Sequence, residues 1–361
     1  MIKKLAQSAG MFFLCCCVCL SGCGQEVQQT SFAGETSDEN VLSEKDNEEP
    51  VEKELFAMDT YMVLKAYGEN AREALNAAAE EITAIEEMVS TGKDTSEISM
   101  LNKNGSGKVS KATGYMIVRS IELYKETGGV FDISIYPVMR AWGFTDQNYR
   151  IPDEKELSGL LETVHADRIR YDEENCQVSF DDKGMEIDLG GIAKGYTADR
   201  VIQILKDYEV ESAVISLGGN VKTLNKKPDG KDWRIAVEDP GDSGKFAGIL
   251  TVSDKAVVTS GGYERYFEQD GEKYHHIIDP STGYPAKNGL SSVSIISEDG
   301  ALADGLSTSL FIMGKEKAAE YWKNHSDEFD AVLVEDDGTV WVTEGIADCF
   351  TSDENWKIIG K

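Results

Sequence analysis

The chain has 361 residues, 41% of them hydrophobic, which suffices for the core of one large or two medium domains. Its formal net charge of −29 argues against nucleic acid as a partner, because an acidic surface repels the phosphate backbone. A bound cation such as a metal ion is compatible with this acidic balance.

The first 22 residues predict a lipoprotein signal peptide. Lys3 and Lys4 precede an apolar run over residues 11–20, and Leu-Ser-Gly-Cys follows at 20–23. Small residues before a cysteine resemble the bacterial lipobox, whose cysteine is lipidated after cleavage. We therefore expect Cys23 to anchor the mature chain to the cell membrane on the extracytoplasmic side. Cleavage would leave Cys176 and Cys349 as the only other cysteines, so no disulfide framework is expected.

Residues 23–54 are expected to comprise the lipidated cysteine and a disordered acidic tether. Between residues 24 and 54 there are ten acidic residues and two lysines, with few large apolar side chains. Such a segment cannot bury enough apolar surface to fold. We therefore place the folded domain at residues 55–361.

This domain is predicted to combine strands and helices. Alternation predicts a strand over residues 56–67, with a Met-Asp-Thr run inside it. Helical spacing predicts helices over residues 70–89, 113–127, 192–205, 301–313 and 316–324. Further strands are predicted over residues 212–217, 233–237, 248–252, 256–259, 331–335 and 340–343. The segments between residues 233 and 259 would be successive strands of one antiparallel sheet. We expect an α+β fold with mixed or antiparallel sheets flanked by helices.

The stretch over residues 187–200 predicts a strand that ends at Asp188, a Gly-Gly turn and the start of a helix. Such a junction directs free backbone N–H groups and the positive end of the helix dipole at one point, and glycines let a phosphate approach closely. Lys194 in the first helical turn suggests an anion there. A plain helix cap with a surface lysine explains the same residues equally well.

Asp304 and Thr308 are four residues apart on a predicted helix and therefore share a face. A carboxylate and a hydroxyl oxygen can bind one hard cation, and such oxygen ligands suit Mg²⁺ rather than zinc. The alternative is that Asp304 caps a helix and Thr308 bonds back to a carbonyl.

His275 and His276 are adjacent on an extended segment, so at most one of them can face a given cleft. No His/Cys cluster has the spacing of a zinc site. A Ser-His-Asp hydrolase is also poorly supported, because Gly-x-Ser-x-Gly is missing.

Taken together, the motifs resemble the ApbE family of FAD:protein FMN transferases, which are flavin-handling lipoproteins. The similarity spans residues 55–345, and the order and spacing of several short motifs make it specific. These motifs are Met58-Asp59-Thr60, Gly129-Val130-Phe131-Asp132-Ile133, Asp188-Leu189-Gly190-Gly191-Ile192-Ala193-Lys194-Gly195, Ser216-Leu217-Gly218-Gly219-Asn220, His276-Ile277-Ile278-Asp279-Pro280 with Thr282-Gly283, and Ala303-Asp304 with Thr308.

The resemblance implies that residues 55–361 form a two-lobed α+β flavin transferase with its active cleft between the lobes. Such an enzyme uses Mg²⁺ to transfer FMN from FAD to a Ser or Thr hydroxyl of another protein as a phosphodiester, releasing AMP. By position, Mg²⁺ would be held by the Gly191 carbonyl, Asp304 and Thr308. The residues carried over as FAD contacts are Met58, Phe131, Asp132, Asp188, Lys194 and Ile277. Asp304 or His276 would also help to remove the proton of the acceptor hydroxyl.

One position departs from the family pattern. Many members have Tyr where this chain has Gly92, so a ring that could lean on the flavin or the adenine is missing. Some members hydrolyse FAD to FMN and AMP, and water competes with the protein hydroxyl for the same phosphorus. An Mg²⁺-dependent FAD pyrophosphatase therefore stays open as an alternative function.

A non-catalytic solute-binding lipoprotein is the other alternative, but such a receptor needs no hard-cation pair beside a phosphate site. No flavin-acceptor segment is evident in the chain itself, so it would act on other proteins. By resemblance, the acceptors would be flavoprotein subunits of membrane redox complexes of the RNF or sodium-pumping NADH:quinone type.

Overall fold

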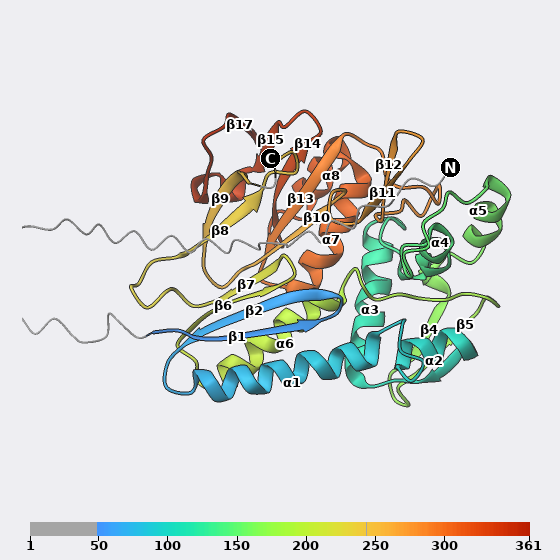
Figure 1. The fold of residues 1–361 in the computed structure, drawn as a ribbon, viewed down its shortest axis with the longest axis horizontal. Coiled ribbons are helices and arrows are strands. Elements are labelled where there is room, and N and C mark those ends of the chain that lie inside the picture. The colour runs from blue at the N-terminus through green and yellow to red at the C-terminus, as the bar shows by residue number, and fades with distance from the viewer. Residues whose placement is uncertain (1–48, 243) are drawn as a thin grey trace, which may run out of the picture. The chain divides into compact units, whose positions relative to one another are not determined.

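A computed structural model describes residues 49–361 with the exception of residue 243 (Figure 1). The predicted signal peptide, Cys23 and residues 24–48 lie outside the described part. Within that part, no helix combines the length and the apolar character that a membrane span would require. The described residues from 49 onward belong to one compact unit.

A nine-stranded mixed sheet forms the centre of the fold, with strand order β1-β2-β6-β7-β10-β13-β14-β15-β17. All neighbours are antiparallel except β15 and β17, which are parallel. The strands are β1 (Val51–Ala57), β2 (Thr60–Tyr67), β6 (Ser212–Leu217), β7 (Asn220–Leu224), β10 (Ala256–Gly261), β13 (Leu290–Ser297), β14 (Asp330–Glu335), β15 (Val340–Thr343) and β17 (Trp356–Ile359).

The two faces of this sheet are covered by different elements. Val257 and Val258, consecutive on β10, belong to different hydrophobic clusters, because successive side chains of a strand point to opposite faces. The Val258 face carries helices α1 (Ala71–Val89), α6 (Ala193–Asp207), α7 (Gly300–Met313) and α8 (Lys315–Asn324). The Val257 face carries the small sheet β16-β9-β8, with β8 (Trp233–Glu238), β9 (Phe246–Val252) and β16 (Phe350–Thr351), and the 3-10 helix η3 (Glu344–Cys349).

A second group of elements lies at one end of the large sheet, on the right in Figure 1. It includes a three-stranded sheet of order β3-β5-β4 and a two-stranded hairpin, β11 with β12. Its members are α2 (Glu97–Asn104), β3 (Ser106–Lys108), α3 (Lys111–Glu126), η1 (Ile133–Ile135), α4 (Tyr136–Trp142), α5 (Glu154–Leu161), η2 (Ala166–Arg168), β4 (Ile169–Asp172), β5 (Gln177–Phe180), β11 (Tyr266–Gln269) and β12 (Glu272–His275). The predicted α+β class with mixed sheets and flanking helices is confirmed.

Several predicted elements differ from the observed ones. β1 begins at Val51, inside the predicted tether, because its backbone pairs with β2 along its whole length. The predicted strand over residues 56–67 is interrupted by a tight turn at Met58 and Asp59, whose φ values are 51° and 59°. Both residues therefore occupy the left-handed region that suits two-residue hairpin turns.

Two further differences concern strand pairing. β8 and β9 are antiparallel neighbours as predicted, but β10 belongs to the large sheet, between β7 and β13. The predicted strand before Asp188 forms no ladder. Its backbone binds a side chain instead: Ile187 donates to Asn102 Oδ1 at 2.7 Å, and Asn102 Nδ2 donates to the Ile187 carbonyl at 2.8 Å.

Candidate active site

The candidate site is built where α6 begins against the second turn of α7. The two helix backbones come very close there, since a Cβ on Gly195 would lie 2.1 Å from the Gly300 carbonyl oxygen. Asp304 on α7 is 4% exposed, and its Oδ2 accepts the Gly195 N–H at 2.8 Å. Its Oδ1 lies 3.9 Å from Lys194 Nζ. A buried carboxylate thus meets the N-terminal turn of a neighbouring helix.

Asp304 does not cap its own helix. The N-cap of α7 is Asp299, whose side chain accepts the Leu302 N–H at 2.9 Å. Thr308 is half-buried one turn after Asp304, and its hydroxyl lies 3.2 Å from Ser260 Oγ on β10. Asp304 therefore does act as a helix cap, as the alternative drawn from the sequence has it, but the helix is the neighbouring α6. Among the described residues, the Thr308 hydroxyl contacts another hydroxyl and no bond from it to a carbonyl is found.

The segment before α6 forms a tight bend. Asp188 Oδ1 accepts the Gly190 N–H at 2.7 Å, and the Asp188 N–H donates to the Ile133 carbonyl at 2.8 Å. Burial raises the pKa of Asp188, and the Gly190 N–H and the positive charges of Arg265 and Lys194 oppose this rise. The bend therefore keeps a carboxylate at the point where the backbone turns into α6.

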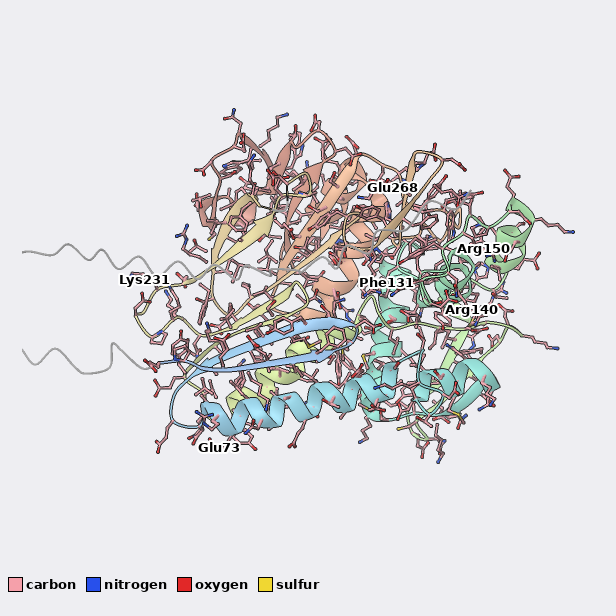
Figure 2. All side chains as sticks on the ribbon, viewed as in Figure 1. Glu73, Phe131, Arg140, Arg150, Lys231 and Glu268 are labelled. Carbon is pink, nitrogen blue, oxygen red and sulfur yellow. The ribbon has the colours of Figure 1, made fainter. Side chains whose placement is uncertain are left out.

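Phe131 connects this bend to α7. A Cβ on Gly191 would lie 3.1 Å from the Phe131 ring, and a Cβ on Gly305 would lie 3.5 Å from it. The ring is buried in the interior of the molecule (Figure 2). Gly191 and the turn of α7 that carries Asp304 therefore pack against the same aromatic side chain.

The carboxylate of Asp132 accepts hydrogen bonds from within the protein. Its Oδ1 accepts the Ser134 N–H at 2.8 Å and the Ser134 hydroxyl at 2.5 Å, and its Oδ2 accepts the Ala166 N–H at 3.3 Å. Burial raises its pKa, and these hydrogen bonds counteract the rise. Asp132 thus caps η1, and its contact with FAD stays a prediction.

Met58 and Ile277 occupy different surroundings. Met58 lies in the β1-β2 turn, with its Sδ 4.0 Å from Thr197 Oγ1 on α6, close to the junction. Ile277 is buried in the same hydrophobic cluster as Phe131. Their contacts with FAD, like those of Phe131, Asp188 and Lys194, stay predictions.

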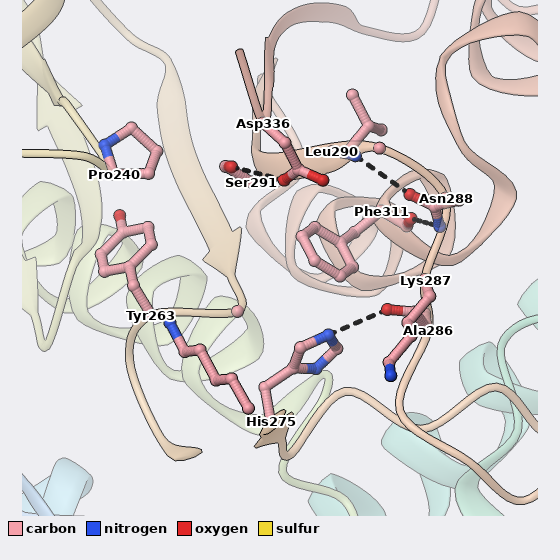
Figure 3. A pocket seen from close by; sticks show the side chains of 13 residues that line it. Pro240, Tyr263, His275, Ala286, Lys287, Asn288, Leu290, Ser291, Phe311 and Asp336 are labelled. Carbon is pink, nitrogen blue, oxygen red and sulfur yellow. Dashed lines mark hydrogen bonds between the residues drawn. The ribbon is translucent and has the colours of Figure 1, made fainter. Parts of the chain in front are cut away.

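The two adjacent histidines face different surroundings, as the strand alternation predicts. His275 Nε2 lies 2.9 Å from the Ala286 carbonyl oxygen, and its ring is nearly perpendicular to that of Phe311, with the centroids 5.5 Å apart. It lines a cavity of about 460 Å³ that contains neither His276 nor Asp304 (Figure 3). His276 Nδ1 lies 3.2 Å from the Arg265 carbonyl oxygen.

The His276 ring is held neutral by its surroundings. Burial, together with the positive charges of Arg265 and Lys194, lowers its pKa to about 3. Because a carbonyl only accepts, the bond to Arg265 requires a hydrogen on Nδ1. The neutral ring therefore has its lone pair on Nε2.

Glu264 and Arg265 were not among the residues predicted from the sequence. Desolvation by the surrounding protein raises the pKa of Glu264 to about 7, while Lys194 and Arg265 oppose the rise and Asp304 adds to it. The positive charge of Arg265 lowers the pKa of both Asp188 and His276. The one signal for them in the sequence is local: the Gly-Gly-Tyr run at 261–263, which begins at the last residue of β10, precedes them directly.

A metal site made of several carboxylates or histidines is not found among the described residues, which hold no group of three or more His, Cys, Asp or Glu able to bind a metal. The predicted Mg²⁺ ligands are of another kind: one carboxylate, one hydroxyl and one backbone carbonyl. Such an oxygen set is compatible with Mg²⁺, which usually keeps several waters and takes substrate phosphate oxygens as further ligands.

The chain is similar to a known family over most of its length. A family model described as "ApbE family" matches residues 58–333. A FAD:protein FMN transferase of Treponema pallidum (strain Nichols) is 32% identical over 314 residues, which is 81% of this chain and 86% of that protein. One from Klebsiella pneumoniae (strain 342) is 42% identical over 205 residues, 56% of this chain and 63% of that protein.

Solved structures share the fold. An ApbE protein from Thermotoga maritima matches with a TM-score of 0.79 and 33% identity, covering 84% of this chain and 100% of that chain. The apo flavinyl transferase ApbE of Pseudomonas stutzeri matches with a TM-score of 0.76 and 25% identity, covering 85% and 98%.

Proposed function

Because this chain belongs to the ApbE family, we propose that it is an Mg²⁺-dependent FAD:protein FMN transferase. It would join FMN to a Ser or Thr hydroxyl of a partner protein. The hydroxyl oxygen forms a bond to the FMN phosphorus, the bond from that phosphorus to the bridging oxygen breaks, and AMP leaves with the electron pair. The observation that carries the proposal is the buried Asp304 carboxylate beside Lys194 and the glycine bend.

The donor set at the α6-α7 junction fits Mg²⁺. Asp304 uses Oδ2 to bind α6, whereas the partner of Oδ1 found among the described residues is the ammonium of Lys194 at 3.9 Å. Asp304, the Thr308 hydroxyl and the Gly191 carbonyl would hold the ion. When bound, Mg²⁺ neutralises charge on the diphosphate and on the leaving AMP. Lys194 supplies a second positive charge beside the N-terminal turn of α6, where a phosphate would be favoured.

His276 is the better candidate for accepting the acceptor's proton. Its Nδ1 is bound to the Arg265 carbonyl, so Nε2 has a free lone pair. A pKa of about 3 makes it a weak base in the empty site, but the negative diphosphate would raise that pKa on binding. Asp304 is less suited, because one of its oxygens already binds α6 and the other is proposed as a metal ligand.

We further propose that the enzyme acts at a membrane surface. The Cys23 lipobox supports a lipid anchor on the extracytoplasmic side, and the acidic stretch after it supports a tether. The acceptors would be flavoprotein subunits of RNF or sodium-pumping NADH:quinone complexes, with the modified Ser or Thr on that side.

The test combines the protein with FAD, Mg²⁺ and the purified flavin-carrying domain of such a subunit. We expect a fluorescent flavin band on the acceptor in a denaturing gel and one AMP released for each flavin attached. AMP without labelled acceptor would indicate a pyrophosphatase. Neither product, with FAD bound, would indicate a solute-binding protein.

Hydrolysis is a specific rival because of Gly92. This residue is exposed in the loop between α1 and α2, and a Cβ there would meet only Ser90 Oγ, at 3.8 Å. The loop has room for a larger side chain. If the missing ring limits transfer, Gly92→Tyr should raise the ratio of labelled acceptor to free FMN; an unchanged ratio would show that the ring does not control partition.

A further inference from the structure

One polar residue interrupts an apolar row that crosses the central sheet. Met62 on β2 lies opposite Leu217 on β6, and Leu217 lies opposite Asn220 on β7. Val221 pairs with Val257, so the same register places Asn220 alongside Val258 on β10. Val258 in turn lies opposite Ile295 on β13. Apolar side chains therefore flank Asn220 on both sides of this row.

Asn220 has a buried donor without a partner. The residue is 2% exposed, and its Nδ2 makes no hydrogen bond in the described part of the chain. Ser292 Oγ is the only other buried polar side-chain atom without a hydrogen-bond partner among the described residues. An unsatisfied buried polar group destabilises the folded state, so an amide at this position needs a reason.

Asn220 faces the helices rather than the small sheet. Lys222, two residues along the same face of β7, binds the Asp199 carboxylate on α6 and, at 2.8 Å, the Glu298 carbonyl. Asp199 also accepts the Gly300 N–H at the start of α7, at 2.9 Å. Lys222 therefore lies beneath the contact between α6 and α7.

The direction of the chain places Asn220 closer to the candidate site. α6 leads into β6, which turns back into β7, so β7 runs in the same direction as α6. Two residues of strand and one turn of helix each span about 6 Å. Lys222 lies beside Asp199 on α6. Asn220 comes two residues earlier on β7 and therefore lies near Gly195, one turn earlier on α6. The Gly195 N–H in turn binds Asp304.

We propose that Asn220 is a FAD-binding residue, whose Nδ2–H donates a hydrogen bond to an oxygen of FAD bound at the α6-α7 junction. This inference rests on the proposed function. The empty protein carries the desolvation cost of the unpaired amide, and the bound dinucleotide removes that cost. Affinity for FAD is therefore gained at the expense of stability in the free protein.

The test measures FAD affinity and thermal stability in the same variants. Asn220→Leu keeps the size of the side chain and removes the donor. We expect its Kd for FAD, measured by titration calorimetry with Mg²⁺, to rise about 10- to 100-fold. We expect the Tm of the free variant to equal or exceed that of the wild type, since the Asn220 Nδ2 makes no hydrogen bond that the substitution could remove in the described part of the chain.

Ser292→Ala is the matched control. Ser292 is the other unpaired group, and its neighbour Val334 belongs to the cluster on the opposite face of the sheet. This variant should also keep or raise the Tm, but its Kd for FAD should equal that of the wild type. Asn220→Ala, which cannot overpack the row, replaces Asn220→Leu if the latter does not fold.

The outcomes separate the inference from the proposed function. A wild-type protein that binds FAD, with an Asn220→Leu Kd within about twofold of it, overturns the role of Asn220 alone. A fall in Tm with unchanged FAD affinity also overturns it, because the amide would then be structural. Wild-type protein that binds no FAD in the presence of Mg²⁺ overturns the proposed function together with this inference.

Discussion

Asp304 combines two tasks in one buried side chain. Its Oδ2 holds the N-terminal turn of α6, and its Oδ1 is directed toward the charge of Lys194. A carboxamide can keep the first task, because its oxygen still accepts the Gly195 N–H. It cannot supply the negative charge that Asp304 alone brings to the proposed ligand set, whose other members are a hydroxyl and a backbone carbonyl.

We therefore predict that Asp304→Asn folds normally but loses flavin transfer by a factor of about 100 or more, whereas FAD affinity falls only in part. The measurement is in-gel flavin fluorescence of the acceptor over time. Asp299→Asn is the control, because it removes the same charge from the same helix and an asparagine still caps it. Full transfer by Asp304→Asn at saturating Mg²⁺ would remove Asp304 from the site.

His276 is expected to stay neutral through the physiological range. Its pKa falls from the ordinary 6.5 to about 3 in the folded protein, chiefly through burial. The unfolded chain binds a proton near pH 6.5 and the folded chain does not, so this residue contributes stability above that pH. The contribution declines as the pH falls from 6.5 toward 3.

The corresponding measurement is an NMR titration of the His276 ring in the protein without FAD, which should show no protonation between pH 7 and pH 5. In urea unfolding, the wild type should lose stability relative to His276→Gln as the pH falls over that range. A ring that titrates near pH 6.5 would show that the packing around it is looser than described.

At the scale of elements, the site depends on how closely α6 and α7 approach. Gly195 and Gly300 allow the contact, and a Cβ on Gly195 would also lie 2.7 Å from Asp304 Cβ. Two hairpin turns support the same region, since Gly218 of the β6-β7 turn packs against Thr60 beside the Met58 turn. Motifs far apart in the sequence therefore meet at one end of the sheet.

We predict that Gly195→Ala lowers the free energy of unfolding by about 1–3 kcal/mol, because the helices must separate. Gly159→Ala in α5 is the control: no atom lies within 4 Å of its Cβ position, so the better helix propensity should raise stability by about 0.5–1 kcal/mol. Urea denaturation followed by circular dichroism measures both. Equal stabilities for the two variants would contradict the close packing of α6 and α7.

At the scale of the whole molecule, the predicted lipobox at Cys23 is the feature that bears on where the enzyme works. The described domain has its own sheet and hydrophobic clusters, so its fold does not require the anchor. Anchoring and catalysis should therefore be separable.

Cys23→Ser should move the protein out of the membrane fraction without changing its transfer rate on a soluble acceptor domain in vitro. Cell fractionation and the in-gel assay measure the two effects. Reduced labelling of membrane-bound acceptors in cells would follow, because the enzyme is no longer concentrated at the membrane. A variant that remains in the membrane fraction would show that Cys23 is not the anchor.

Local patterns were enough to predict most helices, the glycine bend before α6, and Asp304 with Thr308 on one face of α7. The sequence also predicted the family, because several short motifs recur in a characteristic order. These features depend on residues close together in the chain, whose spacing alone defines a face or a turn.

Only the tertiary structure decided which partners those side chains have. Asp304 binds an N–H 109 residues away in the chain. The positive charge of Arg265 lowers the pKa of Asp188 and of His276. The side-chain amide of Asn220 has no hydrogen-bond partner in the described part of the chain. The pairing of β10 with β13 instead of β9 was equally unpredictable. The periodicity of the sequence specifies which side chains share one face of a helix or strand. Their burial and their hydrogen-bond partners depend on which elements pack together, and this packing is determined by residues throughout the chain.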